Sequence, residues 1–586
     1  MIFAAGAGWY AADLYFSRRW YGEAKDAAGL RRKYAVQSSR PATARPRDSQ
    51  SNIRFVDDAK DMGIDFVYDD GANGDFLLVE TMGGGMAVAD FDRDGRLDVF
   101  FPNSCRLPLN LKTEHRRSAL FLRVGATGSG GRFFSECAPN AGLGIRCYAQ
   151  GASAADFNQD GFDDLLVTGF QVIQLFRNQG DGTFVRSPLP TDSLPFSLRW
   201  WTSAAWFDAD DDGNLDLYVC AYATVDPDNP RLCRVGNLRT HCHPRSYPPE
   251  SDVFLRNNGD GRFSDATDAF GFTEHEGRGL GVAVADFSGS GKPSIYVAND
   301  TSSAYLWVRG EGGRPAFTNH AAALGVELTA AGAAMAGMGV AVGDFDRNGF
   351  LDFFITDFFE AGGNLFANLG SQGFVPKSAA VGLLAPTRQR LGFGAAFIDA
   401  DLDGWPDLVI ANGHVTDQSS LGIPYRMRAQ IFRNENGRRF ADVSGPAGEF
   451  FHRLWLGRGL ATGDFDDDGR PDFVVSNMRD HASLLFNRTT PCGNWIGFDF
   501  IGRRCARGVR NVNIEVRHGG VVNRHHQISG GGYLSSSDSR VLLGLANQNA
   551  LLDEVIVNWP SGTRQSLKHL APNRYHLVLE SLWDAK

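Results

Sequence analysis

The chain has 586 residues, of which 43% are hydrophobic and 22% are charged. This is the composition of a soluble globular protein with enough length for several domains. The formal net charge of −10 argues against nucleic acid as the main partner. Glycine, with 69 residues, exceeds its average share of about 7% and suits a turn-rich all-β protein.

The N-terminal end differs from the rest of the chain. Residues 1–12 are uncharged and mostly apolar, but they are too few to span a bilayer as a helix and lack the basic start of an export signal. Residues 37–51 are polar, contain proline and show no periodicity, which is typical of a linker. We therefore expect residues 1–51 to hold a signal remnant or short anchor followed by a linker, with membrane contact only through residues 1–20.

Residues 52–490 carry seven copies of a nine-residue acidic loop. Apolar strand patterns flank the loops, and several are followed by a further apolar strand, a glycine-containing turn and an aromatic residue, which indicates a β-hairpin. Each repeat can therefore supply about four short strands, the content of one propeller blade. The pattern predicts an all-β fold, a seven-bladed β-propeller. The loops begin at Asp90, Asp156, Asp208, Asp286, Asp344, Asp399 and Asp464.

Six of the seven loops have the pattern of a calcium site. They keep an oxygen-bearing side chain at positions 1, 3, 5 and 9 and glycine at position 6, and Ca²⁺ binds several oxygens on a loop that glycine allows to turn sharply. The alternative is a solvated hairpin turn that uses aspartate for turn formation. The expected ligands, with a backbone carbonyl at position 7, are Asp90, Asp92, Asp94, Arg96 and Asp98; Asp156, Asn158, Asp160, Phe162 and Asp164; Asp208, Asp210, Asp212, Asn214 and Asp216; Asp344, Asp346, Asn348, Phe350 and Asp352; Asp399, Asp401, Asp403, Trp405 and Asp407; and Asp464, Asp466, Asp468, Arg470 and Asp472.

The fourth loop departs from this pattern. Ser288, Ser290 and Ser294 replace three carboxylates and leave Asp286, so we expect weak binding or none there. About six Ca²⁺ ions are therefore predicted, and their main expected role is to rigidify the loops.

Residues 491–586 contain no acidic loop and alternate between apolar and polar residues, as in VRNVNIEVRHGG. This alternation predicts a separate, small β-rich domain.

The acidic loops resemble the FG-GAP/VCBS repeats of seven-bladed propellers such as the integrin α head. The segment IRFVDDAKDMGIDFVYDDGA from Ile53, with residues 233–263 and 408–415, resembles blades of the cartilage acidic protein family. The tail, RGVRNVNIEVRHGGVVNRHHQISGGGYLSSSDSRVLLGL, resembles the ASPIC/UnbV domain, although residues 541–545 read VLLGL where that family usually has an HFGLG-like sequence. The resemblance implies a secreted or envelope calcium-binding protein that acts in adhesion or in protein or glycan interaction.

Eight cysteines, an even number with several close pairs, indicate disulfides and an oxidising compartment. A secreted, periplasmic or cell-surface location is therefore expected. The alternative is a set of reduced, buried thiols. The expected pairs are Cys137–Cys147, Cys233–Cys242, Cys492–Cys505 and, by elimination, Cys105–Cys220.

The sequence contains no GxSxG, HExxH or Walker motif, and we predict no catalytic residue. His414 is a weak candidate, and its more common role would be structural. The alternative function is an enzyme or small-molecule binder, for example in natural-product tailoring, with its pocket in the propeller channel or at the seam with the tail. Trp200 and Trp201 would line such a pocket, whereas blade packing is their ordinary role.

Overall fold

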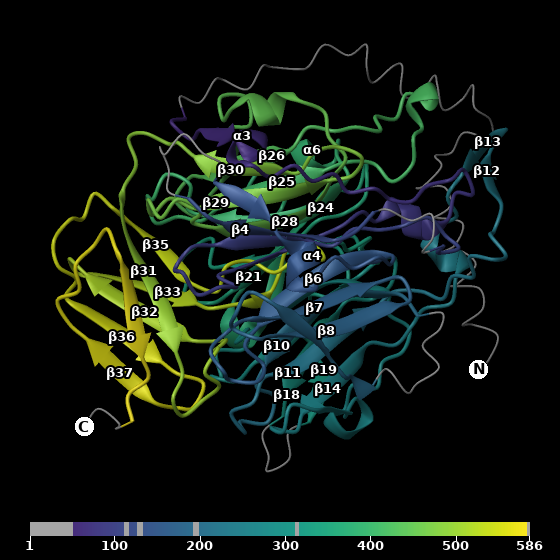
Figure 1. Cartoon of the computed structure of the whole chain (residues 1–586). Coiled ribbons are helices and arrows are strands. Elements are labelled where there is room, and N and C mark those ends of the chain that lie inside the picture. The colour runs from purple at the N-terminus through teal and green to yellow at the C-terminus, as the bar shows by residue number, and fades with distance from the viewer. Residues whose placement is uncertain (1–50, 111–115, 126–132, 191–198, 311–315, 583–586) are drawn as a thin grey trace, which may run out of the picture.

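The computed structural model describes residues 51–110, 116–125, 133–190, 199–310 and 316–582. The N-terminal segment and linker expected at residues 1–51 lie, apart from Ser51, outside the described residues. Strands dominate the fold (Figure 1), and the helices are single turns that connect them. None of the helices in the described residues is long and apolar enough to cross a membrane.

Seven antiparallel sheets share one four-stranded plan within the described residues, and a short strand of the tail adds a fifth strand to one of them. In each sheet the acidic loop joins the first strand to the second. In sheet order, the strands are β2 (Ala87–Ala89), β3 (Asp98–Phe101), β4 (Ala119–Arg123) and β5 (Phe134–Glu136); β6 (Ala149–Ala155), β7 (Asp164–Gly169), β8 (Val172–Asn178) and β9 (Phe184–Ser187); β10 (Trp201–Phe207), β11 (Asp216–Ala221), β14 (Val253–Asn257) and β15 (Phe263–Asp265); β16 (Gly279–Ala285), β17 (Ser294–Asn299), β18 (Tyr305–Arg309) and β19 (Phe317–Asn319); β20 (Val340–Gly343), β21 (Asp352–Ile355), β22 (Asn364–Asn368) and β23 (Phe374–Pro376); β24 (Gly392–Ile398), β25 (Asp407–Asn412), β26 (Gln430–Asn434) and β27 (Phe440–Asp442); and β28 (Gly457–Gly463), β29 (Asp472–Asn477), β30 (Ser483–Asn487) and β1 (Phe55–Asp57).

The sheets form a closed ring. Their first strands contact one another in the order β2, β6, β10, β16, β20, β24, β28 and back to β2. The last sheet takes its outer strand from the other end of the repeat region, because β1 pairs with β30, with Phe55 opposite Asn487. Radial sheets closed by the N-terminal strand define a β-propeller. The all-β, propeller-type fold predicted from the repeats is confirmed.

A residue without a large side chain stands five positions before each acidic loop. At this point, at or just before the first strand, another backbone lies very close. A Cβ on Gly85 would meet the carbonyl oxygen of Leu534 in the tail at 1.9 Å, and one on Gly394 would meet that of Arg458 at 2.7 Å. Such close backbone approach favours glycine, and a small serine takes its place in the third sheet. The residues at this position are Gly85, Gly151, Ser203, Gly281, Gly339, Gly394 and Gly459.

Short helical turns connect the strands. The α-helical turns are α3 (Ala59–Met62), α4 (Ala138–Ala141), α5 (Ala321–Leu324) and α6 (Leu384–Thr387). The 3₁₀ turns are η1 (Leu78–Thr81), η3 (Pro244–Ser246), η4 (Asp268–Phe270), η5 (Gly370–Gln372), η6 (Ser419–Leu421) and η7 (Glu449–His452).

The expected disulfide Cys233–Cys242 is confirmed. It closes a hairpin of β12 (Cys233–Val235) and β13 (Leu238–Thr240), which brings the two Cα atoms to 5.2 Å. The other three expected pairs are wrong, since Cys137, Cys147, Cys220, Cys492 and Cys505 are unpaired thiols.

The two cysteines of each of these pairs lie at different places in the fold. Cys492 and Cys505 flank opposite ends of the eight-residue strand β31 (Asn494–Ile501), which spans about 26 Å at 3.3 Å per residue. Cys137 follows the outer strand of the first sheet, whereas Cys147 precedes the first strand of the second. Cys105 follows β3 of the first sheet, and Cys220 lies within β11 of the third.

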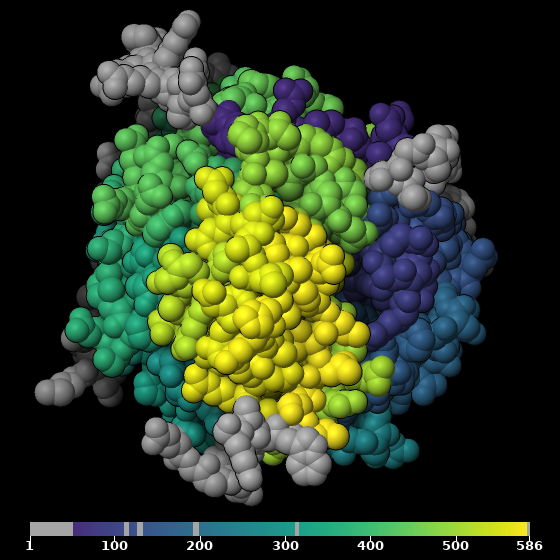
Figure 2. Space-filling view, turned by 90° about the vertical axis from the view of Figure 1, so that its left-hand side faces the viewer, coloured from purple at the N-terminus to yellow at the C-terminus, as the bar shows by residue number. Residues whose placement is uncertain are grey.

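The tail forms two sheets around a shared apolar core. One sheet has the order β35, β31, β38 and the other β33, β32, β36, β37. Figure 2 shows this domain (yellow) seated over one face of the ring. The remaining strands are β32 (Asn513–His518), β33 (Val521–His526), β34 (Ser529–Gly530), β35 (Val541–Ala546), β36 (Glu554–Asn558), β37 (Arg564–Leu567) and β38 (Tyr575–Leu579).

One segment of the tail, residues 529–538, fills the centre of the propeller. It contacts the first strand of every sheet: β2 through Ser536, β6 and β10 through Leu534, β16 through β34, β20 through Gly532, β24 through Tyr533 and β28 through Asp538. A single segment reaches all seven first strands only at their common centre. We call residues 529–538 the axial segment.

Candidate metal centres

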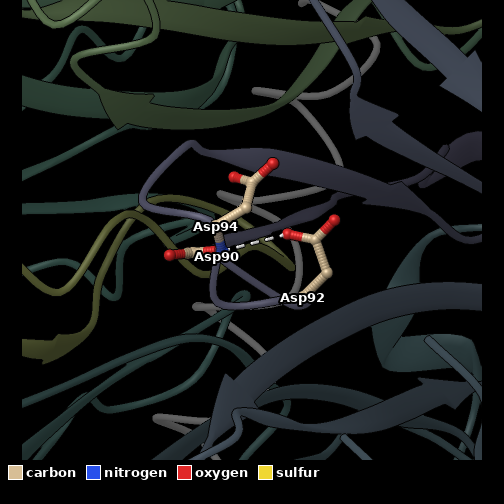
Figure 3. A group of neighbouring side chains, drawn as sticks. All are labelled: Asp90, Asp92 and Asp94. Carbon is tan, nitrogen blue, oxygen red and sulfur yellow. Dashed lines mark hydrogen bonds between the residues drawn. The ribbon is translucent and has the colours of Figure 1, made fainter. Parts of the chain in front are cut away.

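The seven acidic loops share one backbone conformation. The residue at position 4 is left-handed in every loop, with φ of 59° at Arg93 and 72° at Gly289, and the glycine at position 6 also has positive φ. The N–H of that glycine donates to the Oδ2 atom of the aspartate at position 1, as Gly95 does to Asp90 at 2.8 Å. In the first loop this geometry brings carboxylate oxygens of positions 1, 3 and 5 within 4.8 Å of one another; Figure 3 shows these side chains, Asp90, Asp92 and Asp94, around one turn of the loop.

The aspartate at position 9 ties the loop to its sheet. Oδ2 of Asp98 accepts the N–H of Phe91 at 2.9 Å, and Oδ1 accepts the N–H of Arg123 on the third strand at 2.8 Å. Each carboxylate oxygen can still accept a second partner. The same two bonds recur at Asp164, Asp216, Asp352, Asp407 and Asp472.

The carboxylates converge closely enough to hold a cation. In five loops, three of them bring oxygen atoms within 4.8 Å of one another. In the second loop, Asn158 takes position 3, and its Nδ2 donates to Asp160 Oδ2 at 2.8 Å. The five groups are Asp90, Asp92 and Asp94; Asp208, Asp210 and Asp216; Asp344, Asp346 and Asp352; Asp399, Asp401 and Asp403; and Asp464, Asp466 and Asp472.

Several oxygens of the loop aspartates are buried and receive no hydrogen bond from any described residue. A buried carboxylate oxygen without a partner is costly, and a coordinated cation would satisfy it. The donor set is oxygen only, which suits Ca²⁺. The loops therefore fit such an ion. The unpartnered atoms are Oδ1 of Asp156, Asp210, Asp399, Asp401 and Asp466.

Burial also disfavours the charged form of these groups. Desolvation is the main cause that raises the pKa of Asp90, Asp156, Asp208 and Asp344 to about 6 and that of Asp464 to about 7. Neighbouring aspartates add to the increase, while the N–H of the glycine at position 6 opposes it. A divalent ion would reverse this balance by stabilising the ionised carboxylates.

Arginines that the sequence reasoning missed neutralise part of this charge. Arg256 places Nε 2.7 Å from Asp210 and Nη2 2.8 Å from Asp212, and Arg433 places Nε 2.9 Å from Asp401. Both belong to the Arg-Asn dipeptide in the hairpin after the loop, as in VFLRNN and IFRNEN. This repeated Arg-Asn dipeptide is the sequence feature from which these arginines could have been predicted.

The fourth loop has the same backbone conformation as the others but lacks most of their carboxylates. Gly291 N–H still donates to Asp286 Oδ2 at 2.7 Å, but Ser288 Oγ donates to Ser290 Oγ at 2.8 Å, where other loops have carboxylates. The loop conformation therefore does not depend on a full ligand set. The backbone ligands expected at Arg96, Phe162, Asn214, Phe350, Trp405 and Arg470 remain predictions.

The residues considered for a catalytic or small-molecule site do not meet at an open pocket. His414 is 3% exposed, its Nδ1 lies 2.9 Å from the carbonyl oxygen of Thr416, and its ring packs against Phe358. Trp200 and Trp201 are buried in different apolar clusters. Burial lowers the pKa of His414 to about 4.

The tail domain packs onto the loop-bearing face. Tyr575 Oη donates to Asp464 Oδ2 at 3.0 Å, and Arg540 Nη1 lies 3.4 Å from Asp467 Oδ1. Asp464 and Asp467 of the seventh acidic loop therefore contact the tail.

Comparison with known proteins defines the class of this chain. The family model described as "ASPIC and UnbV" matches residues 503–582, and the "FG-GAP-like repeat" model matches residues 156–219 and 399–475. The chain therefore contains FG-GAP-like repeats and a C-terminal ASPIC/UnbV domain.

The expected relationship to cartilage acidic proteins is also confirmed. The chain is 24% identical over 522 residues to Cartilage acidic protein 1 of Homo sapiens. This alignment covers 85% of this chain and 72% of the human protein. The Mus musculus protein of the same name is 23% identical over 519 residues and covers 85% of this chain and 73% of its own length.

Solved structures with similar folds include an Agrocybe aegerita lectin that recognises non-reducing terminal N-acetylglucosamine. It has 16% identity and a TM-score of 0.39, and covers 64% of this chain and 82% of the lectin. BBS1N in complex with ARL6DN has 10% identity and a TM-score of 0.39, and covers 75% of this chain and 99% of its own.

Proposed function

We propose that the protein is an exported calcium-binding β-propeller that acts in adhesion or in another protein or glycan interaction, with calcium mainly rigidifying the blade loops. The observation that carries the calcium part is the set of converging carboxylates with buried, unpartnered oxygens in repeated loops. Calcium would pull together the chain at the junction of the first and second strands of each sheet.

The disulfide and the expected calcium loops support export to a secreted, periplasmic or cell-surface location. The Cys233–Cys242 disulfide closes an external hairpin, and disulfides persist in oxidising compartments. Extracellular calcium modules bind with dissociation constants of about 10⁻⁴ to 10⁻³ M, a range matched to free calcium outside cells.

Because the axial segment fills the centre of the propeller, a partner would bind at the outer surface of the propeller. The axial segment occupies the place where a channel ligand would lie, and Tyr533 and Leu534 are both buried there. A protein or glycan partner would therefore meet the blade rims and connecting loops.

The test is a calcium-dependent capture experiment on secreted and envelope fractions of the source organism. The bait is the full chain, and bound material is eluted with EGTA and identified by mass spectrometry. The matched baits are Asp401→Asn, which removes a metal-loop carboxylate, and Ser290→Ala in the serine-containing loop. A partner retained by wild type and S290A, but less by D401N, supports the proposal. Equal retention with and without calcium by all three baits contradicts it.

A further inference from the structure

A cavity of about 250 Å³ lies between the propeller and the tail domain. Its propeller wall comes from the loops of the fifth, sixth and seventh sheets, and its tail wall comes from β33 and β35. Interdomain cavities are common ligand sites, and drug-sized ligands occupy about 300–1,000 Å³. This cavity therefore suits a smaller molecule.

Most charged groups on the cavity wall already have partners. Arg540 Nε donates to Asp538 Oδ2 at 2.9 Å. Asp464 Oδ2 accepts from the Gly469 N–H at 2.9 Å and from the Tyr575 hydroxyl at 3.0 Å. These groups hold the seam together and leave little capacity for a ligand.

Arg347 is the exception on the cavity wall. Its guanidinium lies 4.7 Å from the centre of the Trp405 ring, and a Cβ added to Gly404 would meet Nη2 at 2.6 Å. The described residues provide no hydrogen bond or ion pair to this side chain. His525, also on the cavity wall, likewise has no side-chain hydrogen bond within the described chain. Arginine carries five N–H donors and no acceptor. The cavity wall therefore offers free hydrogen-bond donors to a ligand.

The charge of the surrounding loops decides which ligand can enter. Asp344, Asp399 and Asp464 line the cavity, and whichever of them are ionised would repel an anion when no cation is bound. Bound Ca²⁺ would offset their charge, as Arg433 does in part for the sixth loop. Arg347 would then be the main charged group on the cavity wall that is still free to bind a ligand.

We propose that this seam cavity binds a small organic anion with an apolar body, its acidic group against Arg347 and His525, and that it does so only when the adjacent loops hold calcium. Leu402, Leu542 and Phe397 on the wall would contact the apolar part of the ligand. This inference rests on the calcium occupancy proposed above, and it adds a ligand that the interaction function does not require.

The test uses three probes that share one aromatic body and differ in charge. The probes are 1-naphthoate, 1-naphthalenemethanol and 1-naphthylmethylamine, each titrated calorimetrically into the full chain in calcium and in EGTA. Arg347→Gln is the informative variant, because Gln159 occupies the same left-handed loop position in the second loop. Arg93→Gln makes the same change in the first loop, away from the cavity, and His525→Gln tests the second donor.

We expect naphthoate to bind the calcium-loaded protein best and to lose about tenfold in affinity in R347Q, which corresponds to one charge-assisted hydrogen bond. H525Q should weaken binding less, and R93Q should leave it unchanged. Preference for the amine, equal binding in R347Q, or no naphthoate binding to calcium-loaded protein overturns the inference. Separate calcium titrations of the same samples distinguish this failure from a failure of the loops to bind calcium.

Discussion

Arg309 of β18 donates two hydrogen bonds to Asp211 in the loop of the preceding sheet, at 3.0 and 2.9 Å. Asp211 is the fourth residue of its loop and is left-handed, with φ of 61°. The only other aspartate at this loop position, Asp467, accepts a hydrogen bond from Arg123 of the next sheet around the ring at 2.8 Å. Arg123 and Arg309 occupy equivalent places at the end of the third strand.

The five other sheets use asparagine at this place. Its side-chain amide donates to a backbone carbonyl in the preceding loop, as Asn178 does to Phe91 at 2.8 Å. Arginine therefore replaces the asparagine bridge where the preceding loop supplies an aspartate. The other asparagines are Asn257, Asn368, Asn434 and Asn487.

This relationship predicts coupling between Arg309 and Asp211. D211N and R309L should each destabilise the protein, and a double-mutant cycle should give a coupling free energy of about 1 kcal/mol. R309N should be tolerated better than R309L, because asparagine can restore the bridge used in five other sheets. Chemical denaturation midpoints measure the effects, with D260N on an exposed turn as the control. Additive single-variant effects would contradict the coupling.

Calcium removal should lower the thermal midpoint. An ion that binds only the folded state stabilises it by about 2.7 kcal/mol per site at one hundred times its dissociation constant. D466N should remove one site, because Asp466 Oδ1 is buried and unpartnered, whereas S290A should leave the number of bound ions unchanged. Differential scanning calorimetry in calcium and in EGTA, with calcium titrations, measures both effects. The same midpoint in both buffers would rule out a structural role for calcium.

The acidic loops were predictable because their chemistry is local. Side chains at positions 1, 3, 5 and 9 meet through one turn whose glycine and spacing are visible in the sequence. The arginines at Asp210 and Asp401 lie 46 and 32 residues away, so they become visible only when hairpin and loop are folded together.

The axial segment was not predictable by the same reasoning. Its sequence, SGGGYLSSSD, has no strand or helix periodicity, and its partners lie up to about 450 residues away, as with Tyr533 and Met82. The wrong disulfides have a similar cause, since closeness along the chain does not bring Cys492 to Cys505 across β31.

A pH dependence should arise at Asp252, away from the metal loops. Burial raises its pKa to about 7, although the Ala221 N–H and the Tyr218 hydroxyl both favour the ionised form. Because the folded state holds this proton more tightly than the unfolded state, the stability contributed is fully present below about pH 4. It is then lost as pH rises through about 7.

The variant D252N should remove this part of the pH dependence. Denaturation midpoints measured from pH 4 to pH 8 in constant calcium compare it with wild type. We expect the wild-type stability to fall more steeply than that of D252N over this range. Parallel profiles would show that Asp252 does not titrate in the folded protein.

The axial segment should make the propeller and the tail unfold together. Leu534 is 1% exposed, its N–H donates to Ser203 Oγ at 3.1 Å and its carbonyl accepts the Ala152 N–H at 3.2 Å. L534A should therefore cost about 2–5 kcal/mol through lost burial and the cavity it leaves. L551A, at a leucine of the same domain that is 53% exposed, should change stability by less than about 0.5 kcal/mol. Calorimetry should show one transition in wild type that shifts down in L534A, because the segment belongs to the tail while its Tyr533 and Leu534 pack in a central apolar cluster of the propeller. Separate melting of the tail, with the propeller transition unchanged in L534A, would show that the segment only occupies the centre without supporting it.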